Sequence, residues 1–116
     1  MDIKISNLLE DICLAELSGA LDFYNSTQLK DFFMKKIREK MAHFIINLNN
    51  VTSISSSGIG ALIYIYSTLK KLNCRLVIVA LDGPVIQALE TTRLKSYFMI
   101  AKSMEEAISL AAPVTP

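Results

Sequence analysis

The first residues of the chain alternate between apolar and polar positions, which is typical of short strands. Residues 3–5 alternate in this way, and residues 12–17 form a second, more apolar run after the polar turn at residues 9–11. Two extended runs joined by a short polar turn predict a hairpin at the N-terminus. Residues 18–22 are then expected to form a loop.

A change to a four-residue period predicts that this loop leads into an amphipathic helix. The apolar side chains of this period are Leu29, Phe33, Ile37 and Met41, with lysine and arginine on the other faces. Asn25 is the expected N-cap, because asparagine accepts hydrogen bonds from early helical N–H groups and Gln28 follows it by three residues. We interpret the basic residues as a solvated helix face.

The middle of the chain predicts a strand and a second helix. Residues 44–48 form an apolar strand, followed by polar residues as far as Thr52. The second helix is expected to begin near Ser56 and to close at Asn73, since asparagine tolerates the left-handed conformation at helix ends. Its apolar stripe comprises Ile59, Leu62, Ile63, Tyr66 and Leu69. Ile65 lies outside that stripe, so the helix is expected to be largely buried.

The last third of the chain repeats the alternation of strand and helix. Residues 76–81 are continuously apolar, which is typical of a strand covered on both faces. Pro84 favours a helix start, because the N–H that proline lacks has no helical partner in a first turn. This third helix is expected to reach about Leu94, and residues 97–100 predict a last short strand.

A fourth helix is predicted by Ser103 and Glu106, whose spacing is that of a capping box, and it should end before Pro113. The predicted order is therefore β-β-α-β-α-β-α-β-α. Helices between strands imply parallel pairing through crossovers, and the opening hairpin adds an antiparallel edge. We expect one mixed α/β domain over residues 1–116, with an ordered core of about residues 2–112.

The composition of the 116-residue chain fits one globular domain and disfavours several functional classes. Apolar residues make up 52% of the sequence, enough for a core without disulfides or metal. The 12 lysines and arginines nearly balance the 11 aspartates and glutamates and form no long run, which disfavours nucleic-acid binding. Cys13 and Cys74 are expected to be buried free thiols, and His43 has no CxxC motif nearby, so no metal site is expected.

The sequence shows no signal for export or for insertion into a membrane. The N-terminus lacks the basic-then-apolar layout of a signal peptide. The longest apolar stretch, residues 59–66, is too short to span a bilayer. We therefore expect a cytoplasmic protein.

The chain lacks the residue sets that common enzyme mechanisms need. It contains no Gly-x-Ser-x-Gly elbow, and His43 has no obvious acid and nucleophile to complete a triad. Residues 57–60 (Ser-Gly-Ile-Gly) resemble a glycine-rich phosphate loop but lack the third glycine of the dinucleotide fingerprint and the Gly-Lys-Ser/Thr of a P-loop. A small enzyme or nucleotide hydrolase is the weakest hypothesis, and neither catalytic residues nor cofactors are expected.

Three consecutive serines, Ser55, Ser56 and Ser57, precede Gly58 at the predicted start of the second helix. Serine is a preferred N-cap, and small residues let a helix approach a sheet closely, so a purely structural role explains part of this turn. Three hydroxyl groups nevertheless exceed what one cap needs.

Two segments of the chain resemble sequence motifs of STAS domains, the bacterial anti-sigma factor antagonist family. Residues 17–22 (Leu-Ser-Gly-Ala-Leu-Asp) are similar to that family's Gly-x-Leu-Asp loop. Residues 47–60, from Asn-Leu to Ser-Ser-Gly-Ile-Gly, are similar to its Asn-Leu…Asp-Ser-Ser/Thr-Gly-Leu-Gly segment. The spacing of the two motifs, the later strand at 76–81 and the helix at Pro84 extend the resemblance over nearly the whole chain.

The resemblance implies a four-helix mixed α/β domain that binds an anti-sigma factor with serine kinase activity. In this family the serine directly after the motif's aspartate is phosphorylated by that kinase, which ends binding, and a PP2C-type phosphatase restores it. Carried onto this chain, the phosphorylated residue is Ser56, with Ser57 and Ser55 as alternatives. The expected partner-binding residues are Asp22, Phe23, Ser55, Ser56, Ser57, Gly58, Ile59 and Gly60.

Two positions depart from the family pattern. Ser55 stands where most switching members have aspartate, which favours an alternative: a non-switching STAS scaffold, or a subunit of a signalling or transport complex. Arg93 stands where many relatives have glycine after the third helix, and it is expected to affect only the local turn. The expected oligomeric state is a monomer or a weak dimer.

Overall fold

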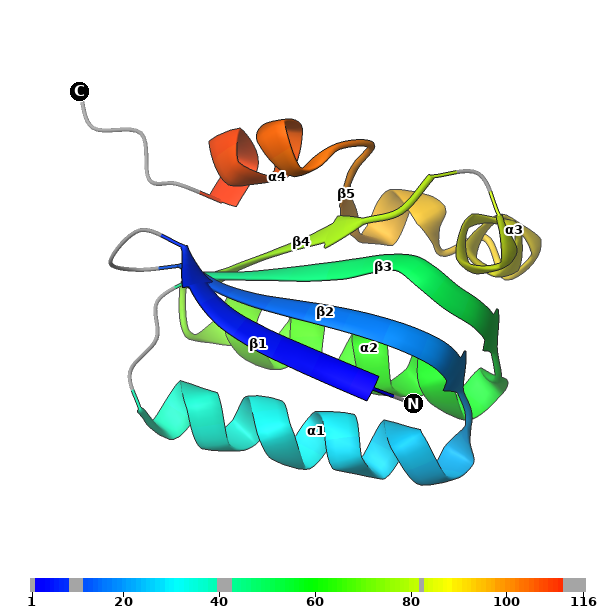
Figure 1. Ribbon diagram of the computed structural model, residues 1–116, viewed down its shortest axis with the longest axis horizontal. Coiled ribbons are helices and arrows are strands. Elements are labelled where there is room, and N and C mark those ends of the chain that lie inside the picture. The colour runs from blue at the N-terminus through cyan, green and yellow to red at the C-terminus, as the bar shows by residue number, and fades with distance from the viewer. Residues whose placement is uncertain (1, 9–11, 40–42, 82, 112–116) are drawn as a thin grey trace.

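The structure, a computed structural model, describes residues 2–8, 12–39, 43–81 and 83–111. Within them, helices and strands follow the order predicted from the sequence (Figure 1). The elements are β1 (Asp2–Leu8), β2 (Ile12–Leu21), α1 (Phe23–Arg38), β3 (His43–Ile54), α2 (Ser56–Lys71), β4 (Arg75–Val79), α3 (Pro84–Thr91), the 3-10 helix η1 (Lys95–Tyr97), β5 (Met99–Ala101) and α4 (Met104–Ala111).

In the described residues the strands form one mixed sheet in the order β1-β2-β3-β4-β5. β1 and β2 pair antiparallel, which confirms the predicted hairpin, although its turn at residues 9–11 lies outside the described part. The pairs β2–β3, β3–β4 and β4–β5 are parallel. α1 and α2 cover one face of the sheet and α4 covers the other (Figure 1). The predicted mixed α/β class is therefore confirmed.

Alternate residues of the central strands point to opposite faces, and this divides the core in two. In β4, Leu76 packs in the larger core with α1 and α2, whereas Val77 packs in the smaller core with α4. Because both faces of β4 are covered, its residues from Leu76 to Val79 are all apolar and buried, as the unbroken run predicted, whereas Arg75 at its start is exposed. Cys13 is buried in the larger core, whereas Cys74 is only partly buried.

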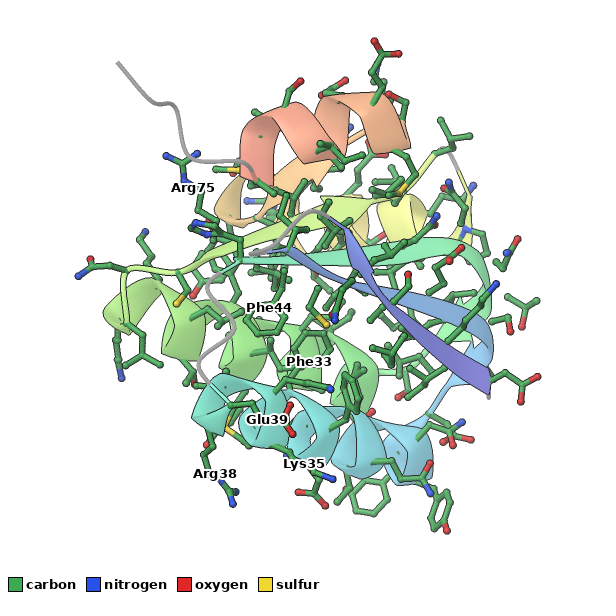
Figure 2. The ribbon with its side chains drawn as sticks, turned by 60° about the vertical axis from the view of Figure 1, so that its left-hand side comes forward. Phe33, Lys35, Arg38, Glu39, Phe44 and Arg75 are labelled. Atoms are coloured by element: carbon green, nitrogen blue, oxygen red, sulfur yellow. The ribbon has the colours of Figure 1, made fainter. Side chains whose placement is uncertain are left out.

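The apolar face of α1 follows the predicted four-residue period. Leu29 and Phe33 are buried and Ile37 is half-buried, whereas Met41 lies outside the described residues. Phe33 packs against Phe44 of β3 with the ring centroids 5.3 Å apart, and Figure 2 shows the two rings between helix and sheet. This contact attaches α1 to the centre of the sheet.

The buried face of α2 differs from the predicted stripe. Ile65, which was placed outside the stripe, is fully buried, whereas Ile63 and Tyr66 are half-buried and Tyr64 is 49% exposed. α2 is therefore buried along one side and not over most of its circumference, because the sheet and α1 leave its outer side open to solvent. Asn73 has a φ of 59°, which confirms the predicted left-handed end.

Strands β2 and β3 are longer than predicted, and their extensions carry the candidate site. Residues 18–21, expected in a loop, continue β2, and the polar residues after Leu48 continue β3 as far as Ile54. The two extensions pair with each other across two register shifts, with Leu21 beside Ile54. Gly19 has a φ of 96°, which a residue without a Cβ adopts readily, so β2 passes this irregularity without ending.

The C-terminal elements are shorter than predicted. β4 ends before Leu81, which is 56% exposed where the chain leaves the sheet, and α3 ends before Leu94. Tyr97 belongs to η1, so the last strand, predicted over residues 97–100, is the shorter β5 at Met99–Ala101. The Ser103 hydroxyl accepts a hydrogen bond from the Glu106 N–H at 3.1 Å, which confirms the predicted cap of α4.

Candidate functional site

The carboxyl ends of β2 and β3 meet where the two long helices begin (Figure 1). The carbonyl oxygen of Leu21 accepts hydrogen bonds from the Ser55 backbone N–H at 3.0 Å and from the Ser55 hydroxyl at 3.3 Å. Leu21 immediately precedes Asp22, and Ser55 opens the serine turn. These two hydrogen bonds therefore place the two predicted motifs side by side.

Ser55 is the N-cap of α2. Its backbone is extended, and its Oγ accepts a hydrogen bond from the Gly58 N–H at 3.1 Å. Because the same hydroxyl donates to Leu21, both its donor and an acceptor position are used. An aspartate here could also cap the helix, but an ionised carboxylate has no proton to donate to a carbonyl. Serine therefore supplies a link to β2 that the aspartate expected from the family pattern does not.

The other two serines begin α2 and differ in exposure. Ser56 is the first helical residue and is exposed, whereas Ser57 is half-buried. Ser55 is also half-buried, and its hydroxyl is held by the cap. Of the three hydroxyl groups, that of Ser56 therefore belongs to the most accessible residue.

Gly58 and Gly60 have different surroundings. A Cβ on Gly58 would lie 2.8 Å from both the Leu21 carbonyl oxygen and Cγ1 of Ile54, closer than real Cβ contacts allow. Gly58 is therefore needed for α2 to approach the sheet. Nothing lies within 4 Å of the corresponding position on Gly60, which is exposed. Ile59, between them, is 8% exposed, so its side chain belongs to the interior.

Asp22, not Asn25, is the N-cap of α1, so the predicted cap was wrong. The backbone of Asp22 is extended, and its carboxylate accepts a hydrogen bond from the Asn25 N–H at 2.9 Å. Asn25 lies inside the first turn, where it lacks the extended backbone that a cap needs. Its side-chain amide instead donates to the Ala20 carbonyl oxygen at 2.8 Å, which ties the helix start to β2.

Two exposed aromatic side chains follow Asp22. Phe23 is 75% exposed and Tyr24 is 70% exposed. A single exposed apolar residue is common, but two adjacent aromatic residues at one helix start are typical of an interaction surface. Tyr24 was not among the residues predicted to bind a partner. Its sequence signal was its position directly after Phe23, off the apolar stripe of α1.

The structure gives no sign of a metal centre or a membrane span in the part of the chain that it describes. No group of three or more histidine, cysteine, aspartate or glutamate side chains there could hold a metal ion. Among the same residues, no helix combines the length and the apolar character needed to cross a membrane.

The fold and the exposed turn define a small mixed α/β domain in which two helix starts and their preceding strands form one surface. The family model for the STAS domain matches residues 6–107. The chain therefore belongs to the STAS domain family.

Several solved structures share this fold. An anti-sigma factor antagonist from Mycobacterium paratuberculosis matches with a TM-score of 0.85 at 17% identity, over 95% of this chain and 92% of that one. A sulfate transporter family protein from Wolinella succinogenes matches with a TM-score of 0.78 at 18% identity, over 91% of this chain and 88% of that one. The phosphorylated form of the Bacillus cell fate determinant SpoIIAA matches with a TM-score of 0.73 at 19% identity, over 96% of this chain and 100% of that one. At these identities the likeness shows a common fold.

Proposed function

We propose that this STAS domain is an anti-sigma factor antagonist, which binds an anti-sigma factor with serine kinase activity and is released when that kinase phosphorylates Ser56. The observation that carries the proposal is the exposed Ser56 at the start of α2, beside the exposed segment that begins at Asp22. Similar folds in an anti-sigma factor antagonist and in a phosphorylated form of SpoIIAA support it.

The proposed contact surface consists of exposed or half-buried residues on both sides of the Leu21–Ser55 pair: Asp22, Phe23, Tyr24, Ser56, Ser57 and Gly60. The two aromatic side chains offer the large apolar area that dominates many protein interfaces. Gly60 leaves room for a partner to approach the helix backbone. Ser55, Gly58 and Ile59 contribute by holding the shape of the turn, through the cap, the close approach to β2 and burial.

Phosphorylation of Ser56 would act by blocking contact. The γ-phosphoryl group of ATP passes to the Ser56 oxygen, the hydroxyl proton leaves, and ADP is released. The new group adds about −1.5 to −2 charges at the positive end of α2, which the domain tolerates. In a complex with a partner packed on the turn, the phosphate would lose its hydration or lie close to negative charges of the partner. Either effect opposes binding by several kcal/mol, on the order of a thousandfold in affinity. Hydrolysis by a PP2C-type phosphatase restores binding.

The phosphorylation site is tested by mass spectrometry of the protein recovered from its own cells. The tryptic peptide 41–70 contains all three serines of the turn, so fragmentation must assign the phosphate. We expect phosphate on Ser56 that changes with growth condition, and we expect Ser56→Ala to abolish it. Ser57→Ala is the matched control and should keep it. Phosphate found only on Ser57 in the wild-type protein would overturn the assignment.

The binding surface is tested by capture of candidate anti-sigma factor kinases. Ser56→Asp adds a negative charge at the proposed interface and should lower the affinity at least tenfold, whereas Ser109→Asp, at an exposed position of α4, should leave it unchanged. Tyr24→Ala removes an aromatic contact and should lower the affinity without changing the fold. Equal binding by all three variants would argue against this surface.

A second candidate function is that of a constitutive scaffold or a subunit of a signalling or transport complex. Ser55 in place of the family's aspartate favours it, and so does the shared fold of a sulfate transporter family protein. The two functions differ in one observable. Absence of phosphate under every growth condition, and after incubation with candidate kinases and ATP, would favour the scaffold.

A further inference from the structure

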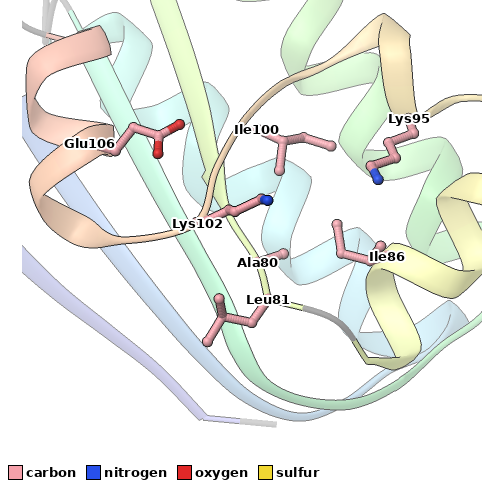
Figure 3. A pocket seen from close by; sticks show the side chains of 7 residues that line it. All are labelled: Ala80, Leu81, Ile86, Lys95, Ile100, Lys102 and Glu106. Atoms are coloured by element: carbon pink, nitrogen blue, oxygen red, sulfur yellow. The ribbon is translucent and has the colours of Figure 1, made fainter.

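A pocket opens at the carboxyl ends of β4 and β5. Its volume is about 450 Å³, within the range of roughly 300–1,000 Å³ that is typical of small-molecule sites. None of its lining residues belongs to the proposed contact surface. The residues that give it its chemical character are Leu81, Ile86, Lys95, Ile100, Lys102 and Glu106 (Figure 3).

The topology of the sheet explains why a pocket forms at this point. β4 leads into α3, whose Val85, Ile86 and Leu89 pack in the larger core with α1 and α2. The neighbouring strand β5 leads into α4, whose Ala107 packs in the smaller core on the opposite face. The chain thus leaves two adjacent parallel strands toward opposite faces. Such a divergence opens a crevice at the carboxyl ends of the strands, which is where α/β sheets commonly bind ligands.

The pocket combines an apolar floor with two cationic groups. Ile86 and Ile100 provide the floor, and Lys95 and Lys102 reach over it from two sides, each directed into the space between them (Figure 3). Neither ammonium group forms an ion pair with another residue of the described chain. Leu81 also lines the pocket and is 56% exposed, so a ligand would cover apolar surface that now contacts water.

We propose that this pocket binds a small organic anion, with its apolar body on Ile86 and Ile100 and its anionic group between Lys95 and Lys102. Lysine binds phosphate and carboxylate groups as a point charge and without strict geometry, which suits two ammonium groups on opposite sides of an open pocket. Glu106 is the acidic residue in the lining, and its carboxylate opposes the anion. The site therefore has two attractive positions and one repulsive position.

The ligand class is tested by titrating the intact 15N-labelled protein with phenyl phosphate and following the backbone amide resonances. We expect shifts at Ile86, Ile100 and Lys102, and binding at least tenfold tighter than that of inorganic phosphate or of neutral benzyl alcohol. Inorganic phosphate that binds as tightly as phenyl phosphate would overturn the proposal, because the charge alone would then explain binding. Shifts confined to other elements would also overturn it.

Three substitutions test the geometry of the site, two that should weaken ligand binding and one that should tighten it. Lys95→Gln and Lys102→Gln should each weaken phenyl phosphate binding by about two- to fivefold, the range of an exposed charge pair. Glu106→Gln should tighten it by a similar factor. Lys70→Gln, at an exposed position of α2, is the matched control and should change nothing. If Glu106→Gln weakens binding, or the lysine variants leave it unchanged while all variants unfold at the wild-type temperature, the proposed site is wrong.

Discussion

The carbonyl oxygen of Leu21 accepts two hydrogen bonds from Ser55, one from the backbone N–H at 3.0 Å and one from the hydroxyl at 3.3 Å. The two residues are 34 positions apart in the sequence. The pair joins the end of β2 to the N-cap of α2, so the segment at Asp22 and the serine turn keep a fixed relative position. A partner that binds both segments would meet a surface that is already ordered.

The cap at Ser55 should be measurable as stability. Ser55→Ala removes the hydroxyl that accepts from Gly58 and donates to Leu21, so we expect the free energy of unfolding to fall by about 1 kcal/mol. Ser55→Asp keeps the capping acceptor and should lose less. Urea denaturation measures both losses. The control is Ser56→Ala, at an exposed position, whose free energy of unfolding should stay within about 0.5 kcal/mol of the wild-type value. Equal losses for the two alanine variants would contradict the cap.

The two glycines of the turn should respond to alanine with opposite signs. In Gly58→Ala the new Cβ would lie 2.8 Å from the Leu21 carbonyl oxygen, so we expect a loss of about 2 kcal/mol in the free energy of unfolding. In Gly60→Ala the methyl group meets open space, and the better helix propensity of alanine should raise stability by up to about 1 kcal/mol. Thermal and urea unfolding of the pair provide the comparison. A stabilised Gly58→Ala protein would show that α2 approaches β2 less closely.

The order of the elements could be predicted because each central strand carries a local signal. The apolar run of β4 arises because both faces of this strand are covered. The four-residue period of α1 arises because one side of this helix packs against the sheet. The limits of the strands could not be predicted in the same way. The extension of β2 through Gly19 to Leu21 begins with serine and glycine, which are typical of loops, and it is stable as a strand because β3 pairs with it.

The candidate site was predicted in part for a similar reason. The serine turn was located because the residues that form it are contiguous, and Ser56 was placed correctly at the helix start. The role of Asp22 as a cap was missed, because Asn25 offers an equally good cap in sequence and only the backbone conformation distinguishes them. The pocket over Ile86 was missed entirely, since only the folded structure shows that Lys95 of η1 and Lys102, which follows β5, line the same pocket.

Arg93 should be replaceable by glycine with a gain in stability. It closes α3 in the left-handed region, with a φ of 60°, while the Leu94 N–H bonds to the Leu89 carbonyl oxygen at 2.8 Å. This is the helix ending in which glycine is usual, because a Cβ costs roughly 1–2 kcal/mol in that conformation. The greater freedom of glycine in the unfolded chain offsets part of this. We therefore expect Arg93→Gly to raise the free energy of unfolding by about 0.5–1 kcal/mol, measured by urea denaturation.

The control for this prediction is Arg93→Ala, which removes the side chain but keeps the Cβ. Its stability should stay close to that of the wild type, because Arg93 is exposed. If the alanine variant is as stable as the glycine variant, the gain comes from loss of the arginine side chain and not from relief of the backbone.

Burial of Cys13 should make the stability of the domain depend on alkaline pH. Burial raises the pKa of the Cys13 thiol above its ordinary value, Lys36 acts to lower it, and Glu39 acts to raise it. The folded state thus favours the neutral thiol. Its contribution to stability is fully present below the ordinary thiol pKa of about 8.5 and is lost as the pH rises toward and through the raised value. We expect the free energy of unfolding to fall as the pH rises above about 8.

Cys13→Ala separates the titration of this thiol from every other effect of alkaline pH on stability. The variant should be less stable at neutral pH, because a buried side chain is shortened, but its stability should fall less steeply with pH than that of the wild type. Burial also raises the pKa of Cys74, which is only partly buried. Cys74→Ala is therefore the matched variant, and its dependence of stability on pH is compared with that of Cys13→Ala. Parallel curves for the wild type and Cys13→Ala would mean that the Cys13 thiol ionises as easily in the folded state as in the unfolded chain.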